Sequence, residues 1–293
     1  MKPYLVIINK KSGRGYGDNI FKENVIKQLN NNYIINYELN NNLKYNDFEG
    51  VIIVGGDGTI VPIINFFYNN NIILPICHVP AGSGNGLCKS ILFSLNKNFS
   101  YENAINLIHR NNVQNLDLFD IKLSYEKIVK PCFLSISWGL ISDIDINTEW
   151  LRYLGELRFT LGGIYYLFKK KSYKGTLKYL EGTKWKLVTG NFVYFLASNV
   201  SHISSNTYSN PGAKLNDGLI HITYIKHDDV SRYDLFNLLL GLDNGTHMKY
   251  VRYITTKEFS LIPENGLLVI DGELNKLQNI EVSVSKKNVN IYV

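Results

Sequence analysis

The sequence predicts an α/β domain followed by a mainly antiparallel β domain. Up to about residue 117, short β-branched runs alternate with segments of helical character, and short loops link them. Beyond that point, short strand patterns separated by turn residues dominate. The alternation favours a three-layer, Rossmann-like arrangement in which helices cover both faces of a parallel sheet. We therefore expect domains at 1–117 and 118–293, and the last strand could return to the first domain.

Apolar runs and glycine loops define the elements of the first domain. The predicted strands are 4–8, 33–39, 51–54 and 72–79, and the predicted helices are 21–29, 60–68, 87–93 and 101–109. Pro62 is expected in the first turn of its helix, where the missing backbone N–H costs little. In parallel sheets of this type, ligands bind beyond the carboxyl ends of the strands. The glycine-rich loops that follow the third and fourth strands both fall at that edge.

The second domain is predicted from turn residues that recur at short intervals. The strand candidates are 118–123, 132–137, 176–179, 192–197, 219–225 and 267–270, and helical patches are expected at 147–170 and 231–241. This pattern is typical of an antiparallel sheet with a few added helices.

Composition narrows the classes of partner. The chain has 293 residues, 45% of them hydrophobic, and a net charge of +6, which suits anionic small molecules or a negatively charged membrane surface. The sequence has no helix-turn-helix, zinc-finger or RNA-reading motif, so nucleic acid is not an expected partner. Cys77, Cys88 and Cys132 lie far apart and form no CxxC pair, which favours buried thiols in a reducing compartment.

Signals for secretion or for a membrane span are not evident in the sequence. Lys2 is followed at once by a short strand pattern rather than by the apolar stretch of a signal peptide. No apolar run approaches the length that spans a bilayer. We expect a cytoplasmic protein that could associate peripherally with membranes.

Two glycine-rich motifs carry the functional signal. The first is Gly55-Gly56-Asp57-Gly58-Thr59, and the second is Pro80-Ala81-Gly82-Ser83-Gly84-Asn85. Glycines let the backbone approach a ligand closely, and successive N–H groups in such turns bind anions. A helix that follows the turn adds its positive end. The pair of motifs therefore indicates a site for phosphate groups.

Asp57 stands out because a carboxylate inside a phosphate site repels the phosphate. Its presence is explained if it accepts the proton of a hydroxyl group that attacks the γ-phosphoryl group of a nucleotide. The alternative is an aspartate that caps a helix. The local sequence leaves both interpretations open.

The loop after the first predicted strand gives a weaker signal. It reads Asn9-Lys10-Lys11-Ser12-Gly13-Arg14-Gly15 and lacks the spacing of a Walker A loop. Lys11 and Arg14 could contact nucleotide phosphates, or the loop could be a solvated basic turn.

With its longer motifs included, the chain resembles the lipid kinase family of diacylglycerol, ceramide and sphingosine kinases, and most of all the sphingosine kinases. The two glycine motifs match the family in general. The narrower matches are 138–145, 152–162, Ser172-Tyr173-Lys174-Gly175, His247-Met248 and Asp271-Gly272-Glu273. The resemblance spans nearly the whole chain.

The resemblance implies a kinase that uses ATP and Mg²⁺, with ATP in a cleft between the domains and a sphingoid base in the second domain. Asp57 would be the catalytic base for the primary hydroxyl group of the lipid. The head group would be held by Asp145, with Asp143 beside it. Leu140, Phe159 and His247 would lie along the acyl pocket. The nucleotide would be bound by Asn9, Lys10, Lys11, Arg14, Gly55, Gly56, Gly58, Thr59, Gly82, Ser83, Gly84, Asn85, Arg152, Arg158, Asp271, Gly272 and Glu273. No direct ligand of the metal ion is implied.

The charge of Asp145 agrees with an amine-bearing lipid. A sphingoid base has a cationic amine, for which a partly buried carboxylate is a natural partner, whereas a neutral diacylglycerol offers no such group. Asp143 and Asp145 could instead be two acids of a surface turn.

The two arginines of the 152–162 motif raise a geometric condition. Arg152 and Arg158 would lie about 240° apart around an ideal helix. Both reach one triphosphate only if the helix breaks between them, and Gly155 is well placed for that break. Without the break, Arg152 would instead pair with Glu156 or Glu149.

Two positions depart from the family pattern. Lys10 stands where a Pro is usual, and Pro62 stands where the family usually has a Glu that belongs to the nucleotide site. Either another acid, such as Glu273 or Glu149, compensates for Pro62, or activity is reduced. Pro62 makes a catalytically weak lipid-binding protein one alternative function. A diacylglycerol or ceramide kinase is the other, although the stretch from Trp138 to Gly162 argues against it.

A cluster of lysines could bring the protein to a membrane. The strip consists of Lys169, Lys170, Lys171, Lys174, Lys178, Lys184 and Lys186. Each lysine near an anionic surface contributes about 1 kcal/mol to binding. The alternative is an ordinary solvated face.

Overall fold

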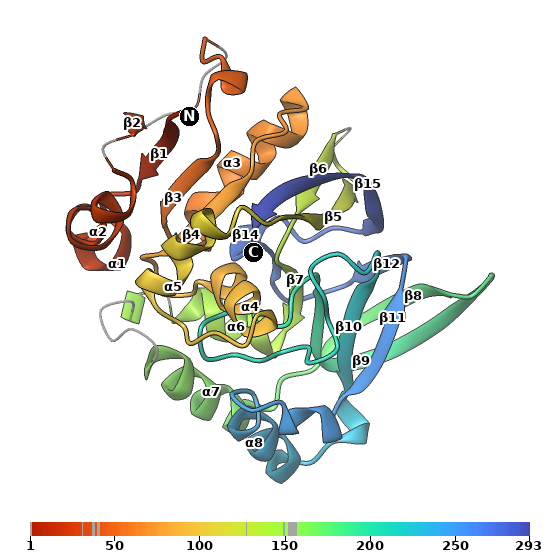
Figure 1. Ribbon diagram of the computed structural model, residues 1–293. Coiled ribbons are helices and arrows are strands. Elements are labelled where there is room, and N and C mark those ends of the chain that lie inside the picture. The colour runs from red at the N-terminus through yellow and green to blue at the C-terminus, as the bar shows by residue number, and fades with distance from the viewer. Residues whose placement is uncertain are drawn as a thin grey trace.

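One continuous sheet runs through the whole molecule (Figure 1). The computed structural model describes residues 2–30, 32–36, 39, 42–126, 128–148, 150–151 and 157–293. Along the main path of the sheet the strands follow the order β14-β13-β7-β9-β8-β12-β15-β4-β3-β1-β2, with β10 and β11 branching from β9, and β5 and β6 from β15.

The first part of the sheet is parallel, as the sequence predicts. Its strands are β1 (Tyr4–Ile8), β2 (Tyr33–Asn36), β3 (Val51–Gly55) and β4 (Ile76–Pro80). All three pairings among them are parallel. Strands β3 and β4 are fully buried, because apolar residues fill them on both faces. The parallel order brings the carboxyl ends of β1, β3 and β4 to one edge.

Helices cover this parallel sheet, but two of them differ from the predicted bounds. The helices are α1 (Ser12–Gly15), α2 (Gly17–Ile20), α3 (Asp57–Asn70), α4 (Gly86–Ser94) and α5 (Tyr101–Ile105). The predicted helix at 21–29 is instead a π-helical turn (Phe21–Val25) followed by a 3₁₀ turn (Ile26–Gln28). Other 3₁₀ turns lie at Tyr45–Asp47 and Asn106–Arg110.

Helix α3 begins earlier than predicted, at Asp57 instead of Ile60. Pro62 is therefore the sixth residue of the helix, so the prediction that it lies in the first turn is wrong. A proline there cannot donate to the carbonyl group of Gly58, four residues earlier. Both Gly58 and Pro62 are exposed, so water can reach that carbonyl group.

The second part of the sheet is antiparallel, which confirms the predicted fold class. Its strands are β5 (Val113–Leu123), β6 (Val129–Cys132), β7 (Ser135–Gly139), β8 (Tyr173–Glu181), β9 (Lys184–Ser198), β10 (Ile220–Lys226), β11 (Arg252–Thr256), β12 (Glu258–Pro263), β13 (Leu268–Ile270), β14 (Glu273–Asn275) and β15 (Ile280–Tyr292).

Strands β5 and β15 join the two parts of the sheet. They pair with each other in antiparallel register over most of their length. At its end, β15 also lies parallel to β4, where Ile291 faces Ile76. Strand β5 passes through residue 117 without interruption. The domain boundary at that residue stays a prediction.

Three helices pack on the antiparallel part: α6 (Leu140–Asn147), α7 (Leu157–Lys169) and α8 (Arg232–Leu240). The predicted helical patch at 147–170 misses α6, which starts directly after β7 because Gly139 adopts φ +91° and turns the chain. Short 3₁₀ turns lie at His227–Asp229 and Thr246–Lys249. Figure 1 shows α7 and α8 side by side, and they are in contact.

Apolar residues form three clusters. One fills the parallel part, a second lies within the antiparallel sheet, and the third lies between that sheet and helices α6, α7 and α8. Cys77, Cys88 and Cys132 are buried free thiols, in agreement with the prediction. Among the described residues, no helix is both long and apolar enough to cross a bilayer.

Candidate active site

The two glycine motifs meet backbone to backbone at the carboxyl ends of β3 and β4. A Cβ atom added to Gly82 would lie 2.4 Å from the Cα atom of Gly56, and one added to Gly56 would lie 2.9 Å from the Cα atom of Gly82. No side chain fits between them, so both positions require glycine. The amide group of Ala81 donates to the carbonyl oxygen of Gly55 at 2.8 Å and ties the two loops together.

The carboxylate of Asp57 bridges these loops. It is the first residue of α3, but it caps another helix: its oxygens accept from the amide groups of Gly86 (2.7 Å) and Leu87 (3.2 Å) in the first turn of α4. The side chain is nearly buried, at 8% exposure. A Cβ atom added to Gly84 would lie 3.1 Å from it. The two interpretations of Asp57 are therefore compatible, since one carboxylate can cap α4 and still face the second glycine loop.

Burial affects the pKa of the Asp57 carboxyl group. Loss of solvent raises the pKa of its carboxyl group above the ordinary 3.8, and the charge of His78 and the amide donors of α4 partly oppose that rise. A raised pKa makes the carboxylate a stronger base than an exposed aspartate, which suits proton abstraction from an alcohol.

His78 is a buried neighbour of this carboxylate that the sequence analysis did not select. Its Nε2 lies 3.0 Å from the carbonyl oxygen of Gly55, and burial lowers the pKa of its ring. Within the described part of the chain, its Nδ1 has no hydrogen-bond partner. The sequence feature that could have indicated His78 is that it is a lone histidine inside an apolar strand.

Asn9 connects the first predicted loop to the glycine motifs. Its amide group donates to the hydroxyl group of Thr59 at 2.9 Å, and its side-chain oxygen accepts from the backbone of Lys11 at 3.1 Å. Lys10 and Lys11 are exposed, and Lys10 lies 4.0 Å from Asp18. The placement of the Arg14 side chain lies outside the described atoms. The structure thus brings Asn9 and Thr59 together at the edge where both glycine loops end.

The second glycine loop is locked by its own asparagine. Asn85 adopts φ +61° and exchanges two hydrogen bonds with Gly82, accepting from its amide group (2.9 Å) and donating to its carbonyl oxygen (2.7 Å). Asn85 is buried, whereas Ser83 is exposed. Ser83 is therefore the side chain that this loop presents to solvent, and Asn85 holds its shape.

Asp271 contacts the turn between β6 and β7. Its buried carboxylate accepts from the amide groups of Phe133 (3.2 Å), Leu134 (2.9 Å) and Ser135 (3.1 Å), and from the thiol group of Cys132 (3.0 Å). Burial raises the pKa of this carboxyl group, and these donors partly oppose the rise. The acid therefore fixes the turn between β6 and β7.

The neighbours of Asp271 lie at the surface. Gly272 has φ +79°, and Glu273 is exposed, with a carboxylate oxygen 3.8 Å from Lys130. In this motif, Glu273 is the acid that solvent and ligands can reach.

The predicted lipid-side residues gather around α6. Asp143 is buried and accepts from Tyr173 (2.7 Å) and Lys171 (3.1 Å), while Asp145 on the same helix is partly exposed. The alternative interpretation, two acids in a surface turn, is excluded because both lie on α6 and Asp143 is buried.

Two further lipid-side predictions, Leu140 and His247, fall on described side chains in or near the apolar cluster under α6, α7 and α8. Leu140 is part of this cluster. His247 is fully buried, with Nδ1 3.1 Å from the carbonyl oxygen of Gly241 and Nε2 2.8 Å from that of Ser209. The predictions on Arg152 and on the break at Gly155 lie outside the described residues, as do the side chains of Arg158 and Phe159.

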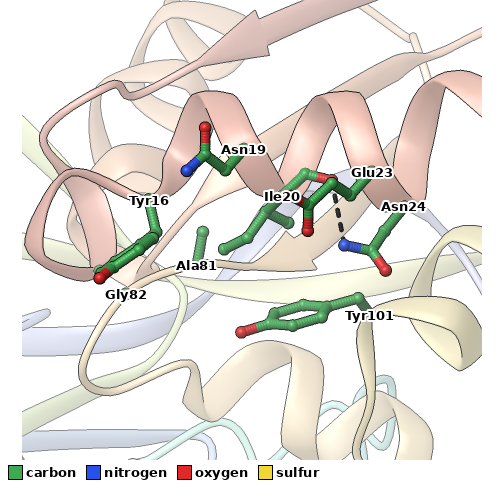
Figure 2. A pocket seen from close by; sticks show the side chains of 9 residues that line it. Tyr16, Asn19, Ile20, Glu23, Asn24, Ala81, Gly82 and Tyr101 are labelled. Carbon is green, nitrogen blue, oxygen red and sulfur yellow. Dashed lines mark hydrogen bonds between the residues drawn. The ribbon is translucent and has the colours of Figure 1, made fainter.

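A pocket of about 330 Å³ borders the second glycine loop. Figure 2 shows Asn19, Ile20, Glu23 and Asn24 on one side of it and Tyr101 on the other, with Ala81 between. Gly82 is the predicted site residue among its lining residues. A cavity therefore lies on the outer side of this loop.

The chain is similar in sequence to known lipid kinases. Residues 3–121 match the diacylglycerol kinase catalytic domain. The chain is 28% identical to sphingosine kinase 1 of Arabidopsis thaliana, covering 93% of this chain and 68% of that protein. It is also 28% identical to sphingosine kinase 1 of Homo sapiens, covering 92% and 85%.

Solved structures show a similar fold. A diacylglycerol kinase from Bacillus anthracis aligns with a TM-score of 0.69 at 14% identity, over 99% of this chain and 96% of that one. An NAD kinase from Archaeoglobus fulgidus in complex with ATP aligns with a TM-score of 0.50 at 15% identity, over 100% and 94%.

Proposed function

Since this chain is a sphingosine kinase-like lipid kinase with a diacylglycerol kinase catalytic domain, we propose that it transfers the γ-phosphate of ATP to the primary hydroxyl group of a sphingoid base. The observation that carries this proposal is Asp57. It is a nearly buried carboxylate of raised pKa that stands where two glycine loops touch. A base at that position removes the hydroxyl proton as the oxygen attacks the phosphorus atom.

ATP would place its phosphates at the glycine edge. Gly58 is exposed in the first turn of α3, and the exposed Ser83, Lys10 and Lys11 lie in loops that follow the strands at this edge. Positively charged and N–H donor groups stabilise the charge that develops on the transferred phosphoryl group.

Mg²⁺ would bind to this site as a complex with the nucleotide. The oxygens of Asp57 and Asp271 already accept from N–H or S–H groups, and the described residues contain no cluster of three His, Cys, Asp or Glu side chains. Phosphate oxygens and water would supply most of the ligands, as is common for Mg²⁺. The ion would neutralise charge between the phosphates.

The lipid would lie in the second part of the molecule. Its apolar chain fits the chemistry of the cluster under α6, α7 and α8, to which Leu140 belongs. Its cationic amine would meet Asp145, which is partly exposed on α6. Asp143 would support this region from below through its pairing with Lys171 and Tyr173.

Peripheral membrane binding would give the enzyme access to such a lipid. Helices α7 and α8 expose apolar side chains along adjacent faces, at Leu161, Ile164, Tyr165, Phe168, Tyr233, Phe236 and Leu240. Lys169 is the last residue of α7 and Lys170 follows it, and both belong to the predicted basic strip. Apolar contact combined with lysines is the composition of a surface that binds anionic membranes.

Incubation with labelled ATP and a choice of lipids tests the proposed function. Sphingosine, diacylglycerol and ceramide are offered separately under equal conditions. We expect phosphate transfer to sphingosine in clear preference to the other two. Preferred transfer to diacylglycerol or ceramide would contradict the proposed substrate. Tight sphingosine binding without transfer would instead support the catalytically weak lipid-binding protein.

A further inference from the structure

The segment that links β9 to β10 contacts the second glycine loop. We refer to residues 199–210 as the β9–β10 segment. The amide group of Ser205 donates to the carbonyl oxygen of Gly84 at 2.7 Å. Its neighbour Ser204 forms an isolated antiparallel bridge with Asn85. A part of the chain more than a hundred residues away thus holds the backbone of the proposed phosphate loop.

The same segment contacts the proposed lipid side. Ile203 packs against the apolar cluster under α6, α7 and α8. The amide group of Tyr208 donates to the carbonyl oxygen of Leu242 at 2.6 Å. The carbonyl oxygen of Ser209 lies 2.8 Å from Nε2 of His247. Within this segment, the residues that contact the second glycine loop and those that contact the proposed lipid side are therefore only a few positions apart.

Ser90 of α4 links the segment to the candidate base. Its hydroxyl group accepts from the amide group of His202 (3.0 Å) and donates to the carbonyl oxygen of Gly86 (2.8 Å). The amide group of Gly86 in turn donates to Asp57. Ser90 is 2% exposed, so water does not readily reach the hydrogen bonds that its hydroxyl group makes. The position of Asp57 thus depends on where the segment lies.

The packing around this link is tight. A Cβ atom added to Gly86 would lie 2.6 Å from the carbonyl oxygen of His202. The ring of His202 stacks on Tyr208 at 4.5 Å, and Phe93 of α4 meets His202 at 4.8 Å. A displacement of the segment therefore moves the first turn of α4 with it.

We propose that the β9–β10 segment couples lipid binding to the geometry of the second glycine loop and of Asp57, with Ser90 as the positioning residue. The proposal rests on the proposed function. A lipid that binds against the apolar cluster restrains the segment, so that the nucleotide meets a loop that is already ordered. By linkage, the nucleotide raises the affinity for the lipid by the same factor.

Equilibrium binding to the full chain tests the coupling. The affinity for ATP is measured with and without a sphingosine analogue that lacks the primary hydroxyl group and cannot be phosphorylated. We expect the analogue to tighten ATP binding at least about fivefold, the lower end of typical coupling. In Ser90→Ala most of this factor should disappear. Ser94→Ala is the matched control, because the Ser94 hydroxyl group donates to the carbonyl oxygen of Ile91 within α4, and it should keep the factor.

Equal factors in the wild type and Ser90→Ala, or no factor in the wild type, would overturn the proposal. Should thermal unfolding show that Ser90→Ala does not fold, a second pair takes its place. Ser205→Pro removes the amide group that donates to Gly84 and should lose the coupling, whereas Ser205→Ala keeps that group and the coupling. Transfer of labelled phosphate to sphingosine is recorded in parallel. Its absence in the wild type contradicts the proposed function, whereas transfer with unchanged coupling in the variant contradicts this inference alone.

Discussion

Single acidic residues in this molecule have different tasks despite similar burial. Asp57 and Asp271 are both nearly buried, and burial raises the pKa of both carboxyl groups. Asp57 stands at the contact of two glycine loops, whereas Asp271 is surrounded by the donors of the β6–β7 turn. Position relative to the loops, more than burial, separates the candidate base from the structural acid.

Asp271→Asn should destabilise the fold. An amide group has one acceptor oxygen for the three amide donors and the thiol group that now meet the carboxylate, so a buried donor loses its partner. We expect a loss of about 1–3 kcal/mol in the free energy of unfolding, measured by urea denaturation. Glu273→Gln, two residues away and exposed, is the control and should stay within about 0.5 kcal/mol. Equal stability of the two variants would contradict the structural role of Asp271.

Asp145→Asn should remove the preference for an amine-bearing lipid. The variant keeps the shape of the side chain but loses the negative charge that would meet the sphingoid amine. The ratio of kcat/KM for sphingosine to that for an uncharged long-chain alcohol measures this preference. An unchanged ratio would move the head-group site away from Asp145.

At the scale of the elements, helix α3 is the main departure from the expected local structure. Its start at Asp57 leaves Pro62 inside the helix, exposed and without an N–H group to offer Gly58. The glycines preceding the helix allowed several starting points, so the sequence pattern alone did not fix the first turn.

Two substitutions at Pro62 separate a helix effect from a nucleotide effect. Pro62→Ala restores the N–H group and should stabilise the fold by as much as about 3 kcal/mol, with little change in the KM for ATP. Pro62→Glu restores the N–H group and adds a carboxylate, and should in addition lower the KM for ATP or raise kcat several-fold. Steady-state kinetics and thermal unfolding of both variants check this. Identical kinetic constants for Pro62→Ala and Pro62→Glu would show that another acid already takes the place of the family's Glu in the nucleotide site.

The strands were more predictable than the helices. Runs such as 51–54 and 192–197 are apolar because the sheet buries them on both faces, and this burial is visible in the sequence. Helix α6 was missed because its start depends on the positive φ of Gly139 and on packing against β7, neither of which a periodic pattern reveals. The second glycine motif was recognised, but its lock by the β9–β10 segment is a long-range contact that no local pattern encodes.

At the scale of the whole molecule, charge and exposed apolar groups collect near α7 and α8. We expect the protein to sediment with vesicles that contain anionic lipid, and less with neutral vesicles or at high salt, because screening weakens the lysine contribution. Phe168→Ala, at 71% exposure, should weaken binding to the vesicles, whereas Ile73→Ala, at 81% exposure on another part of the molecule, should not. Sedimentation that depends on neither the anionic lipid content nor the salt concentration would contradict the proposed role of this surface in membrane binding.

The whole-molecule arrangement also connects the glycine loops with the proposed lipid side. Strand β15 joins the parallel and antiparallel parts, and the β9–β10 segment crosses from the lipid side to the second glycine loop. The base and the proposed acyl cluster therefore belong to one connected structure. The sequence motifs predicted both ends, whereas their connection required the structure.

The rate of phosphate transfer to sphingosine by Asp57→Asn, compared with the wild type at saturating ATP, tests the central claim most directly. Asparagine keeps the size of the side chain and one oxygen that can accept from Gly86 or Leu87, so thermal unfolding should show a protein that is folded but less stable. A general base contributes about 10²–10⁴ to a rate, and we predict a loss of kcat in that range. A folded Asp57→Asn variant that transfers phosphate at the wild-type rate would contradict the account.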